Sequence, residues 1–231
     1  MSDQFSSIDA AIRAFREGKI VIVVDAEDRE NEGDFICAAE DATPEAINFM
    51  ITHGRGQVCM SILPDVARRL ELPRMVESNS TPLGTAFTIP VDHVSARTGI
   101  TAVERAVAVA AILNPESSPQ DFVRPGHLFP LIAKEGGILR RAGHTEATID
   151  LARLAGKEPT GVLCEILDTD GNRADRNALR ALAKKHGLEI ISIEELIRYR
   201  RTKEKLVERV AEADLPTKWG KFRVLGYNVG Y

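Results

Sequence analysis

Apolar and polar positions follow two different periods along the first part of the chain. An apolar face that recurs every three to four positions predicts a helix over 8–17, with Ser6 or Ser7 as its N-cap. The β-branched run 20–24 predicts a buried strand. After a charged loop, a second strand is expected over 35–38.

The same two patterns continue to about position 201. Thr43 and Pro44 start a helix that ends at Gly54 and Gly56, because threonine caps a helix and proline fits its first turn. Residues 101–113 are apolar nearly all round, which predicts a buried helix. Further helices are expected over 145–155, 176–186 and up to about 201, and further strands over 58–63, 86–89, 128–133, 162–167 and 189–193.

Successive strands occur both as hairpin-like pairs and with helices between them. This mixture favours an α+β fold, in which a mixed β-sheet carries helices on both faces and forms three layers, α-β-α. The tail changes character beyond position 202, because 203–212 is charged and 215–231 is aromatic and glycine-rich. The tail is therefore expected to begin a separate, strand-rich unit.

Composition narrows the possible partners and compartments. The 231 residues carry a net charge of −4, which argues against a general nucleic-acid binder but leaves room for a small anion held by local arginines. No apolar run is long enough for a membrane span, and the polar N-terminus lacks the core of a signal peptide. Cys37, Cys59 and Cys164 lie far apart in apolar runs, as buried thiols in a reducing compartment do. A cytoplasmic protein without membrane contact is therefore expected.

A dense charged loop, 25–34, separates the first two predicted strands, and Arg29 is its only basic residue. A solvated hairpin tip is one interpretation of such a cluster. The loop also follows a buried strand, where α/β sheets tend to place ligand sites, and its self-repulsion is costly without a cation. Hard oxygen ligands suit magnesium or manganese, and the spacing does not match an EF-hand.

A second polar segment, 140–147, precedes a predicted helix. Gly143 permits a close backbone approach, and the free N–H groups of a helix that begins at Thr145 can bind phosphate. Arg141 offers a bidentate donor to the same anion, and His144 can ligate a metal. A lone histidine is more often structural, but these neighbours favour the ligand role.

Three further features admit both a functional and a structural interpretation. His127, which follows Arg124 at the entrance of a strand, is either a proton carrier or a satisfied turn residue. Glu165, in the middle of an apolar strand, is either functional or on the wet face of an edge strand. The loop 95–101 provides either a second phosphate contact or a helix cap.

Taken in order, these segments resemble one family over roughly residues 5–200. The stretches 28–34, 124–127, 141–147 and the strand with Glu165 resemble the 3,4-dihydroxy-2-butanone 4-phosphate synthases of riboflavin biosynthesis. The resemblance implies a magnesium-dependent lyase that converts ribulose 5-phosphate to 3,4-dihydroxy-2-butanone 4-phosphate and formate. It implies a metal-chelated enediolate, dehydration and skeletal rearrangement as the chemical steps. It also implies a homodimer with sites near the subunit interface.

The resemblance assigns metal and substrate contacts position by position. Glu30 and His144 match the metal-binding pair, which would hold Mg²⁺ or Mn²⁺, and the number of ions is left open. The substrate contacts implied by the resemblance are Arg29, Glu30, Asp34, Arg141, Ala142, Gly143, His144, Thr145 and Glu165. Of these, the run from Arg141 to Thr145 matches the phosphate cradle. Ala142 stands where the family commonly has Gly or Pro, but its side chain is small, so this difference puts the assignment of the cradle in little doubt.

The resemblance also implies the catalytic residues. His127 and Glu165 match two positions held essential for catalysis, and His127 would donate or collect protons. The base that removes the proton at carbon 3 would be either Asp34 or Glu165, and the residues do not decide between them. Cys59 matches a cysteine near the substrate.

The tail resembles a second family. Residues 207–217 and 219–223 resemble the opening of GTP cyclohydrolase II, a domain often fused behind the synthase. The zinc-binding cysteines and the GTP site of that family are missing. The resemblance therefore implies a synthase domain over 1–202, and a linker with a truncated cyclohydrolase-like start over 203–231. A fragment or a degenerate bifunctional protein without cyclohydrolase activity would have this organisation.

Other functions remain open at this point. A magnesium-dependent aldolase or isomerase acting on a similar phosphorylated sugar would use the same residue types, but it would not release formate. A catalytically idle nucleotide- or RNA-binding module would bind ligands without turnover, and the negative net charge weighs against nucleic acid. A purely structural domain would need four motif matches to arise by chance.

Overall fold

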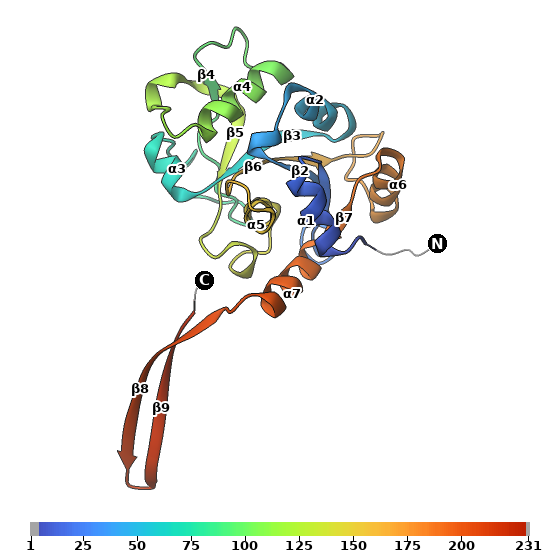
Figure 1. Cartoon of the computed structure of the whole chain (residues 1–231). Helices are drawn as coiled ribbons and strands as arrows, with labels where there is room; N and C mark the ends of the chain where they lie inside the picture. The colour runs from blue at the N-terminus through green and yellow to red at the C-terminus, as the bar shows by residue number, and fades with distance from the viewer. Residues whose placement is uncertain (1–4, 230–231) are drawn as a thin grey trace.

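A mixed sheet forms the centre of the molecule in the computed structural model, which describes residues 5–229 (Figure 1). Its seven strands lie in the order β4-β5-β3-β6-β2-β1-β7. Neighbours are antiparallel except for the pairs β3–β5 and β1–β7, which are parallel. The strands are β1 Val21–Val24, β2 Gly33–Ala38, β3 Arg55–Ile62, β4 Val91–His93, β5 Phe122–Ile132, β6 Gly161–Ile166 and β7 Ile190–Ser192.

Helices cover both faces of this sheet, so the predicted three-layer α+β architecture is confirmed. One face carries α2, α3, α4 and α6, and the other carries α1, α5 and α7. Alternation along each strand divides the core, because Ile22 and Val24 face one helical layer while Val21 and Val23 face the other. The helices are α1 Ile8–Arg16, α2 Pro44–His53, α3 Pro64–Arg69, α4 Ala102–Leu113, α5 His144–Ala155, α6 Arg176–His186 and α7 Ile193–Lys203.

Helix starts follow the capping signals in the sequence. The Ser7 hydroxyl accepts a hydrogen bond from the Ala10 N–H at the start of α1, over 3.2 Å. Thr43 does the same for Ala46 ahead of Pro44 in α2, also over 3.2 Å. Each cap satisfies a backbone N–H group that would otherwise lack a partner inside the helix, so these two predicted starts are confirmed.

The segment between α3 and α4 differs from its prediction. The strand expected over 86–89 is wrong, because only isolated bridges to β5 and to Arg74 occur there. Thr88 donates to the Pro130 carbonyl and Ile132 donates to the Ala86 carbonyl, but Pro130 has no N–H to return, so the ladder breaks. The short helix α3, before this segment, and the short strand β4, within it, were not predicted from the sequence.

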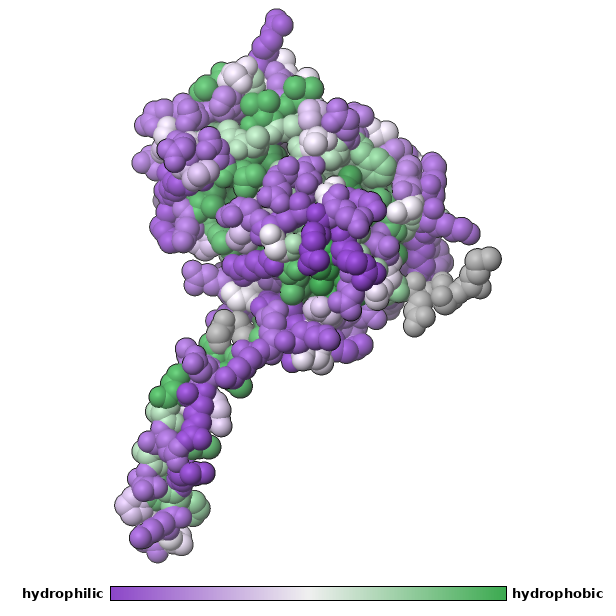
Figure 2. Space-filling model, in the orientation of Figure 1, coloured by the Kyte–Doolittle hydropathy of each residue, from purple (hydrophilic) through white to green (hydrophobic). Residues whose placement is uncertain are grey.

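Helix α4 is less buried than its composition predicted. It was expected to be a buried helix, but Val103 is 58% exposed and Val107 is 39% exposed. Ile100, just before the helix, and Val123, on β5, are also exposed. Figure 2 shows apolar residues gathered over this upper part of the molecule. A groove of about 560 Å³ runs between α4 and the start of α2, so an apolar surface lies open along α4.

A buried ion pair ties the last helix to the three-layer body. The Arg200 guanidinium, on α7, lies 2.7 Å from a carboxylate oxygen of Asp150, which is 1% exposed. Asp150 also accepts a hydrogen bond from the Ile138 N–H, and burial raises the pKa of this carboxyl. Residues through α7 therefore belong to the same packed unit.

The tail forms a hairpin that stands away from the sheet (Figure 1). Strands β8, Val207–Thr217, and β9, Gly220–Val229, pair antiparallel and form a two-stranded sheet of their own. One side of its distal half is apolar, where Leu215 faces Phe222 and Ala213 faces Val224. Phe222 is 55% exposed, so this apolar side is open to solvent. Within the described residues, no helix has the length and apolar character needed to cross a membrane.

Candidate active site

The register of two neighbouring strands places Asp34 opposite Glu165. They pair across β2 and β6, with side chains on the face covered by α5. The sequence had placed Asp34 in the loop, but β2 begins at Gly33 and fixes Asp34 in the sheet. A cavity of about 140 Å³ opens above this pair. Its lining is Arg29, Glu30, Glu32, Asp34, Cys59, Thr85, Phe87, Leu131, Arg141, His144, Thr145, Leu163 and Glu165.

Asp25 organises the charged loop on one side of the cavity. Its carboxylate accepts hydrogen bonds from the Arg29 guanidinium at 2.7 Å and from the backbone N–H groups of Glu30 and Glu32 at 3.2 and 2.8 Å. The Arg29 guanidinium also contacts the Glu30 carboxylate directly. The loop is therefore folded around a buried carboxylate and is not a solvated hairpin tip.

His144, the first residue of α5, presents one bare ring nitrogen to the cavity. Its Nε2 lies 3.1 Å from the Val23 carbonyl oxygen, which can only accept, so Nε2 carries the proton and Nδ1 keeps a lone pair. Nδ1 lies 3.7 Å from a carboxylate oxygen of Asp34. Burial lowers the pKa of His144 to about 4, so the ring is neutral at physiological pH, the form that ligates a metal.

The donors around His144 fit a divalent cation. Ligand atoms of Asp25, Glu30 and His144 lie within 4.8 Å of one another. The Asp34 Oδ1 atom is buried and has no hydrogen-bond partner. Burial raises the pKa of Asp34 well above its usual range, and the charges of Glu165 and Glu32 raise it further. Carboxylate oxygens with one neutral imidazole suit Mg²⁺ or Mn²⁺.

Of this group, Glu30 is better placed than Asp25 to bind an ion directly. Both Asp25 oxygens already accept hydrogen bonds, so Asp25 is suited to hold the loop and to add negative charge. The Glu30 side chain is 36% exposed, and within the described residues its carboxylate pairs with the Arg29 guanidinium alone. The predicted pair, Glu30 and His144, thus lies together, and Asp25 is a supporting carboxylate that the sequence did not single out.

The opposite wall of the cavity is built like an anion cradle. Gly143 is the N-cap of α5 and has no side chain to occupy the free N–H groups of the first turn. A Cβ on Gly143 would collide with the Arg141 guanidinium and lie 3.1 Å from Nη2 of Arg29. Two guanidinium groups and a helix start therefore converge on one point, as in sites that bind phosphate.

Arg141 is held in this position by three partners. Its guanidinium donates to the buried Glu146 carboxylate at 2.7 Å, to the Thr85 hydroxyl at 2.9 Å and to the Leu83 carbonyl at 3.3 Å. Thr145 lines the cavity beside it, whereas Ala142 is exposed and lies outside the lining. The predicted run 141–145 is thus a cradle built from the backbone and Arg141, without the Ala142 side chain.

Glu165 and Cys59 line the floor of the cavity. The Glu165 carboxylate accepts a hydrogen bond from the Gln57 N–H at 2.8 Å, and burial raises the pKa of this carboxyl. A Cβ on Gly56 would lie 2.8 Å from this carboxylate, so Gly56 leaves room for it. Cys59 is buried, and burial, then the charges of Glu165 and Asp34, raise the pKa of its thiol. Cys59 is therefore a neutral wall residue in this structure.

His127 lies outside this cavity, unlike the other predicted catalytic residues. It stands on β5, where its Nδ1 is 2.7 Å from a carboxylate oxygen of Asp92 and its backbone N–H donates to the other oxygen. The Asp92 carboxylate orients the ring and leaves Nε2 free, and the His127 side chain is 44% exposed. Within the described residues, His127 does not line the cavity of its own chain that contains Glu30 and His144.

The loop 95–101 is built around a helix cap. The Glu104 carboxylate accepts hydrogen bonds from the backbone N–H groups of Arg97, Thr98 and Gly99 and from two threonine hydroxyls. These bonds lower the pKa of Glu104 to about 2. Thr101 in turn accepts from the Glu104 N–H. Thr101 is the N-cap of α4, so the cap interpretation of this loop is confirmed.

Sequence reasoning missed part of the lining. Thr85 and Phe87 come from the long segment between α3 and β4, which carries no chemical motif. Leu131 and Leu163 are apolar residues of β5 and β6, indistinguishable in sequence from core positions. Asp25 had a usable signal, because it is the first residue after a fully buried strand.

A small cavity that joins a carboxylate-rich cation site to an anion cradle is typical of enzymes that act on phosphorylated small molecules. The comparisons with known proteins give the family. Residues 9–199 match the model of the family described as 3,4-dihydroxy-2-butanone 4-phosphate synthase. The chain therefore belongs to the 3,4-dihydroxy-2-butanone 4-phosphate synthase family.

Individual relatives and structures agree with this assignment. The chain is 55% identical over 224 residues to the riboflavin biosynthesis protein RibBA of Bacillus mycoides and 52% identical over 223 residues to that of Bacillus subtilis. It covers 97% and 96% of itself in these matches but only 56% of either relative, so it spans little more than half of their length.

Two solved structures share the fold at high similarity. One is RibBX, a two-domain 3,4-dihydroxy-2-butanone 4-phosphate synthase from A. baumannii, with a TM-score of 0.91, 45% identity, and coverage of 98% of this chain and 67% of that one. The other is a 3,4-dihydroxy-2-butanone 4-phosphate synthase in complex with two magnesium ions, with a TM-score of 0.81 and 40% identity. That match covers 86% of this chain and 98% of the other.

The geometry of the cradle generates a prediction about Gly143. In the Gly143→Ala variant, the new methyl group displaces the Arg141 guanidinium, so we expect inorganic phosphate to bind at least about tenfold more weakly, a loss of about 1.4 kcal/mol. Isothermal titration calorimetry measures this. Ala142→Ser, a change of similar size outside the lining, should bind phosphate as the parent chain does. Equal affinities in all three proteins would show that Gly143 is not part of an anion site.

Proposed function

We propose that the chain converts D-ribulose 5-phosphate to 3,4-dihydroxy-2-butanone 4-phosphate and formate, as a step of riboflavin biosynthesis. The observation that carries the proposal is the cavity in which the Glu30–His144 pair faces the Gly143 cradle. A sugar phosphate has an anion at one end and vicinal oxygens at the other, which matches these two walls. Membership of the synthase family supports the same reaction.

The residues of the chain can be given roles in this reaction. Arg141 and the start of α5 at Thr145 bind the phosphate and so position the reacting carbons through remote binding energy. Glu30 and His144 would hold Mg²⁺ or Mn²⁺, and a bound divalent ion supplies Lewis-acid polarisation of the carbonyl and hydroxyl oxygens of the sugar. A solved relative in complex with two magnesium ions supports this cofactor.

Asp34 and Glu165 are the two groups placed to take a proton. They stand side by side beneath the cavity, and either carboxylate can remove the proton at carbon 3. Loss of the carbon 1 hydroxyl as water and rearrangement of the carbon skeleton would follow, and a water would then add and release carbon 4 as formate. His127 would exchange protons through its free Nε2 during these later steps.

The reaction predicts formate release that depends on a divalent ion. With ribulose 5-phosphate and magnesium we expect formate to accumulate, and EDTA should abolish it. Glu30→Gln removes one charged ligand and should lower turnover by about a hundredfold or more, since loss of a metal ligand removes Lewis-acid stabilisation worth several kcal/mol. Formate dehydrogenase coupling measures the rate.

Glu27→Gln provides a matched control for that measurement. Glu27 lies in the same loop, and its carboxylate pairs with Arg176 outside the cavity, so formate release should be unchanged. Turnover of ribulose 5-phosphate without formate, in a folded and metal-loaded sample, would point instead to an aldolase or isomerase. Full activity in Glu30→Gln would rule out the metal role of this residue.

We further propose that the chain works as a homodimer and that each cavity receives His127 from the second copy. Two observations support this. His127 carries an oriented, half-exposed imidazole but lies outside its own cavity. An apolar surface that includes Val103 and Val107 lies open along α4. A second copy seated on that surface would bury it, and a twofold axis would exchange one His127 for the other.

Mixing two inactive variants tests the dimer and the origin of His127 together. His127→Ala and Glu30→Gln should each be inactive, but a mixed dimer keeps one complete site. With equal amounts and free subunit exchange, about one quarter of the parent activity should return. A mixture of Glu30→Gln with Arg141→Ala leaves both cavities defective and should stay inactive. No recovery in the first mixture, with mixed dimers seen by native mass spectrometry, would place His127 in its own chain's site.

We infer that the first domain ends with α7, near position 202, and that 203–231 is a linker followed by the beginning of a second, cyclohydrolase-like domain. The buried Arg200–Asp150 pair supports the first part. The hairpin supports the second, because isolated two-stranded sheets are marginally stable and this one leaves an apolar side without a partner in the described chain. The three free buried thiols support a reducing, cytoplasmic location.

Paired substitutions test this division. Arg200→Met keeps the apolar stem but leaves the Asp150 carboxylate buried and unpaired, so the free energy of unfolding should fall by about 2–4 kcal/mol. Arg198→Met removes an exposed pair with Glu194 and should change it by less than about 0.5 kcal/mol. Phe222→Ser, on the hairpin, should leave the main urea transition unchanged. A drop with Phe222→Ser as large as with Arg200→Met would mean that the hairpin belongs to the first domain.

A further inference from the structure

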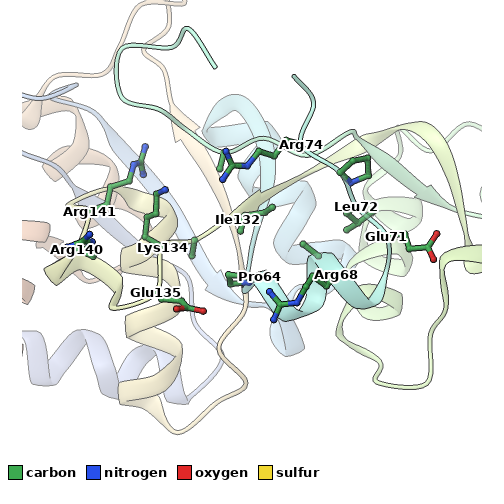
Figure 3. A pocket seen from close by; sticks show the side chains of 14 residues that line it. Pro64, Arg68, Glu71, Leu72, Arg74, Ile132, Lys134, Glu135, Arg140 and Arg141 are labelled. Atoms are coloured by element: carbon green, nitrogen blue, oxygen red, sulfur yellow. The ribbon is translucent and has the colours of Figure 1, made fainter. Parts of the chain in front are cut away.

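A second and larger cavity lies on the far side of Arg141 from the candidate active site. It measures about 1110 Å³ and runs between α3, the end of β5 and the turn that precedes α5 (Figure 3). Arg141 is the one residue that lines both cavities. The roles given above to Arg29, Glu30, His144 and Glu165 leave this cavity without a function, because none of them lines it.

The charge of this cavity is opposite in sign to that of the chain. Its lining contains four arginines and a lysine against two glutamates, whereas the chain carries a net charge of −4. Arg68 pairs with Asp65, and Arg141 pairs with Glu146. Within the described residues, the side chains of Arg74, Lys134 and Arg140 have no hydrogen bond or ion pair. The cavity therefore holds cations whose charge no carboxylate offsets.

Three cations of the lining, Arg74, Lys134 and Arg141, gather on one side of the cavity. Figure 3 shows the ends of the Arg74, Lys134 and Arg141 side chains directed toward the same region from three segments of the chain. Glu146 pairs with Arg141, but within the described residues Arg74 and Lys134 have no carboxylate partner, so an anion between the three side chains would offset their repulsion. Several donors on one side suit a ligand with more than one phosphate group.

Part of the cavity wall is apolar. Ile132 on β5 keeps accessible surface there, as do Pro64, Pro73 and Ala86, whereas Leu72, Ala67 and Ala133 are almost fully buried. Inorganic polyphosphate or a sugar phosphate would leave this wall in contact with polar atoms or water. A flat ring system would cover it and gain from removing apolar area from water.

We propose that this cavity binds a nucleotide that carries at least two phosphate groups. The phosphates lie among Arg74, Lys134 and the outer side of Arg141, and the base packs over Pro73 and Ile132. The site is separate from the one proposed for ribulose 5-phosphate, and its occupancy needs neither a divalent ion nor the synthase reaction. Its volume is ample for such a ligand, since sites for cofactor-sized molecules measure roughly 300–1,000 Å³.

Calorimetric titration of the full chain with ADP, in EDTA and without ribulose 5-phosphate, tests the proposal. We expect ADP to bind once per chain and at least about tenfold more tightly than adenosine or inorganic pyrophosphate, because each of these lacks one of the two recognised parts. The double variant Arg74→Ala/Lys134→Ala should weaken ADP binding by at least about tenfold. Affinity should also fall as salt is raised.

A control of equal charge makes the result specific. Arg153→Ala/Lys184→Ala removes two exposed cations outside the cavity and should leave ADP affinity unchanged. Loss of ADP binding in both double variants would show a general charge effect and overturn the proposal. So would the absence of saturable ADP binding, or pyrophosphate binding as tightly as ADP. Binding lost in Gly143→Ala but kept in Arg74→Ala/Lys134→Ala would place ADP in the candidate active site.

Discussion

The rest of the site depends on two carboxylates, Asp34 and Glu165, which lie side by side on neighbouring strands. The β2–β6 register fixes their distance from one another, and burial raises the pKa of both. Like charges in such a place are costly unless a cation or a proton offsets them. His144, the first residue of α5, lies next to them. Its ring is neutral, and its Nε2–H donates to the Val23 carbonyl. The chain thus offers ligand atoms that suit a cation, and a bound ion would supply the balancing charge.

The two arginines give the cavity its opposite pole. Arg29 and Arg141 each have a carboxylate partner, Asp25 and Glu146, so each guanidinium is fixed before any ligand arrives. Fixed donors lose little conformational freedom on binding, which favours affinity for a charged group. Gly143 makes this possible, because a side chain there would occupy the place where the guanidinium groups converge. A carboxylate pole and a guanidinium pole within one small cavity select a ligand that is itself polar at both ends.

Much of this arrangement could be predicted because its motifs lie at the ends of regular elements. Ser7 and Thr43 indicated helix starts, and the unbroken apolar run before Asp25 indicated a buried strand. The charged loop after that strand and the helix start near Thr145 could be recognised from their residue types. The strand expected over 86–89 failed because Pro130 on the partner strand cannot donate, and that depends on a pairing invisible in the local sequence. For the same reason Thr85 and Phe87 escaped notice, since only the tertiary fold brings them to the cavity.

Two discrepancies between sequence and structure have a single physical explanation in the proposed dimer. Helix α4 has the composition of a buried helix, yet Val103 and Val107 are exposed. His127 has an oriented imidazole of the kind used in proton transfer, yet it does not line the cavity that holds Glu30 and His144. An apolar composition can reflect burial at a subunit interface as well as burial inside one chain, because apolar surface is removed from water in both cases. A second copy on α4 would give both residues the surroundings that their chemistry calls for.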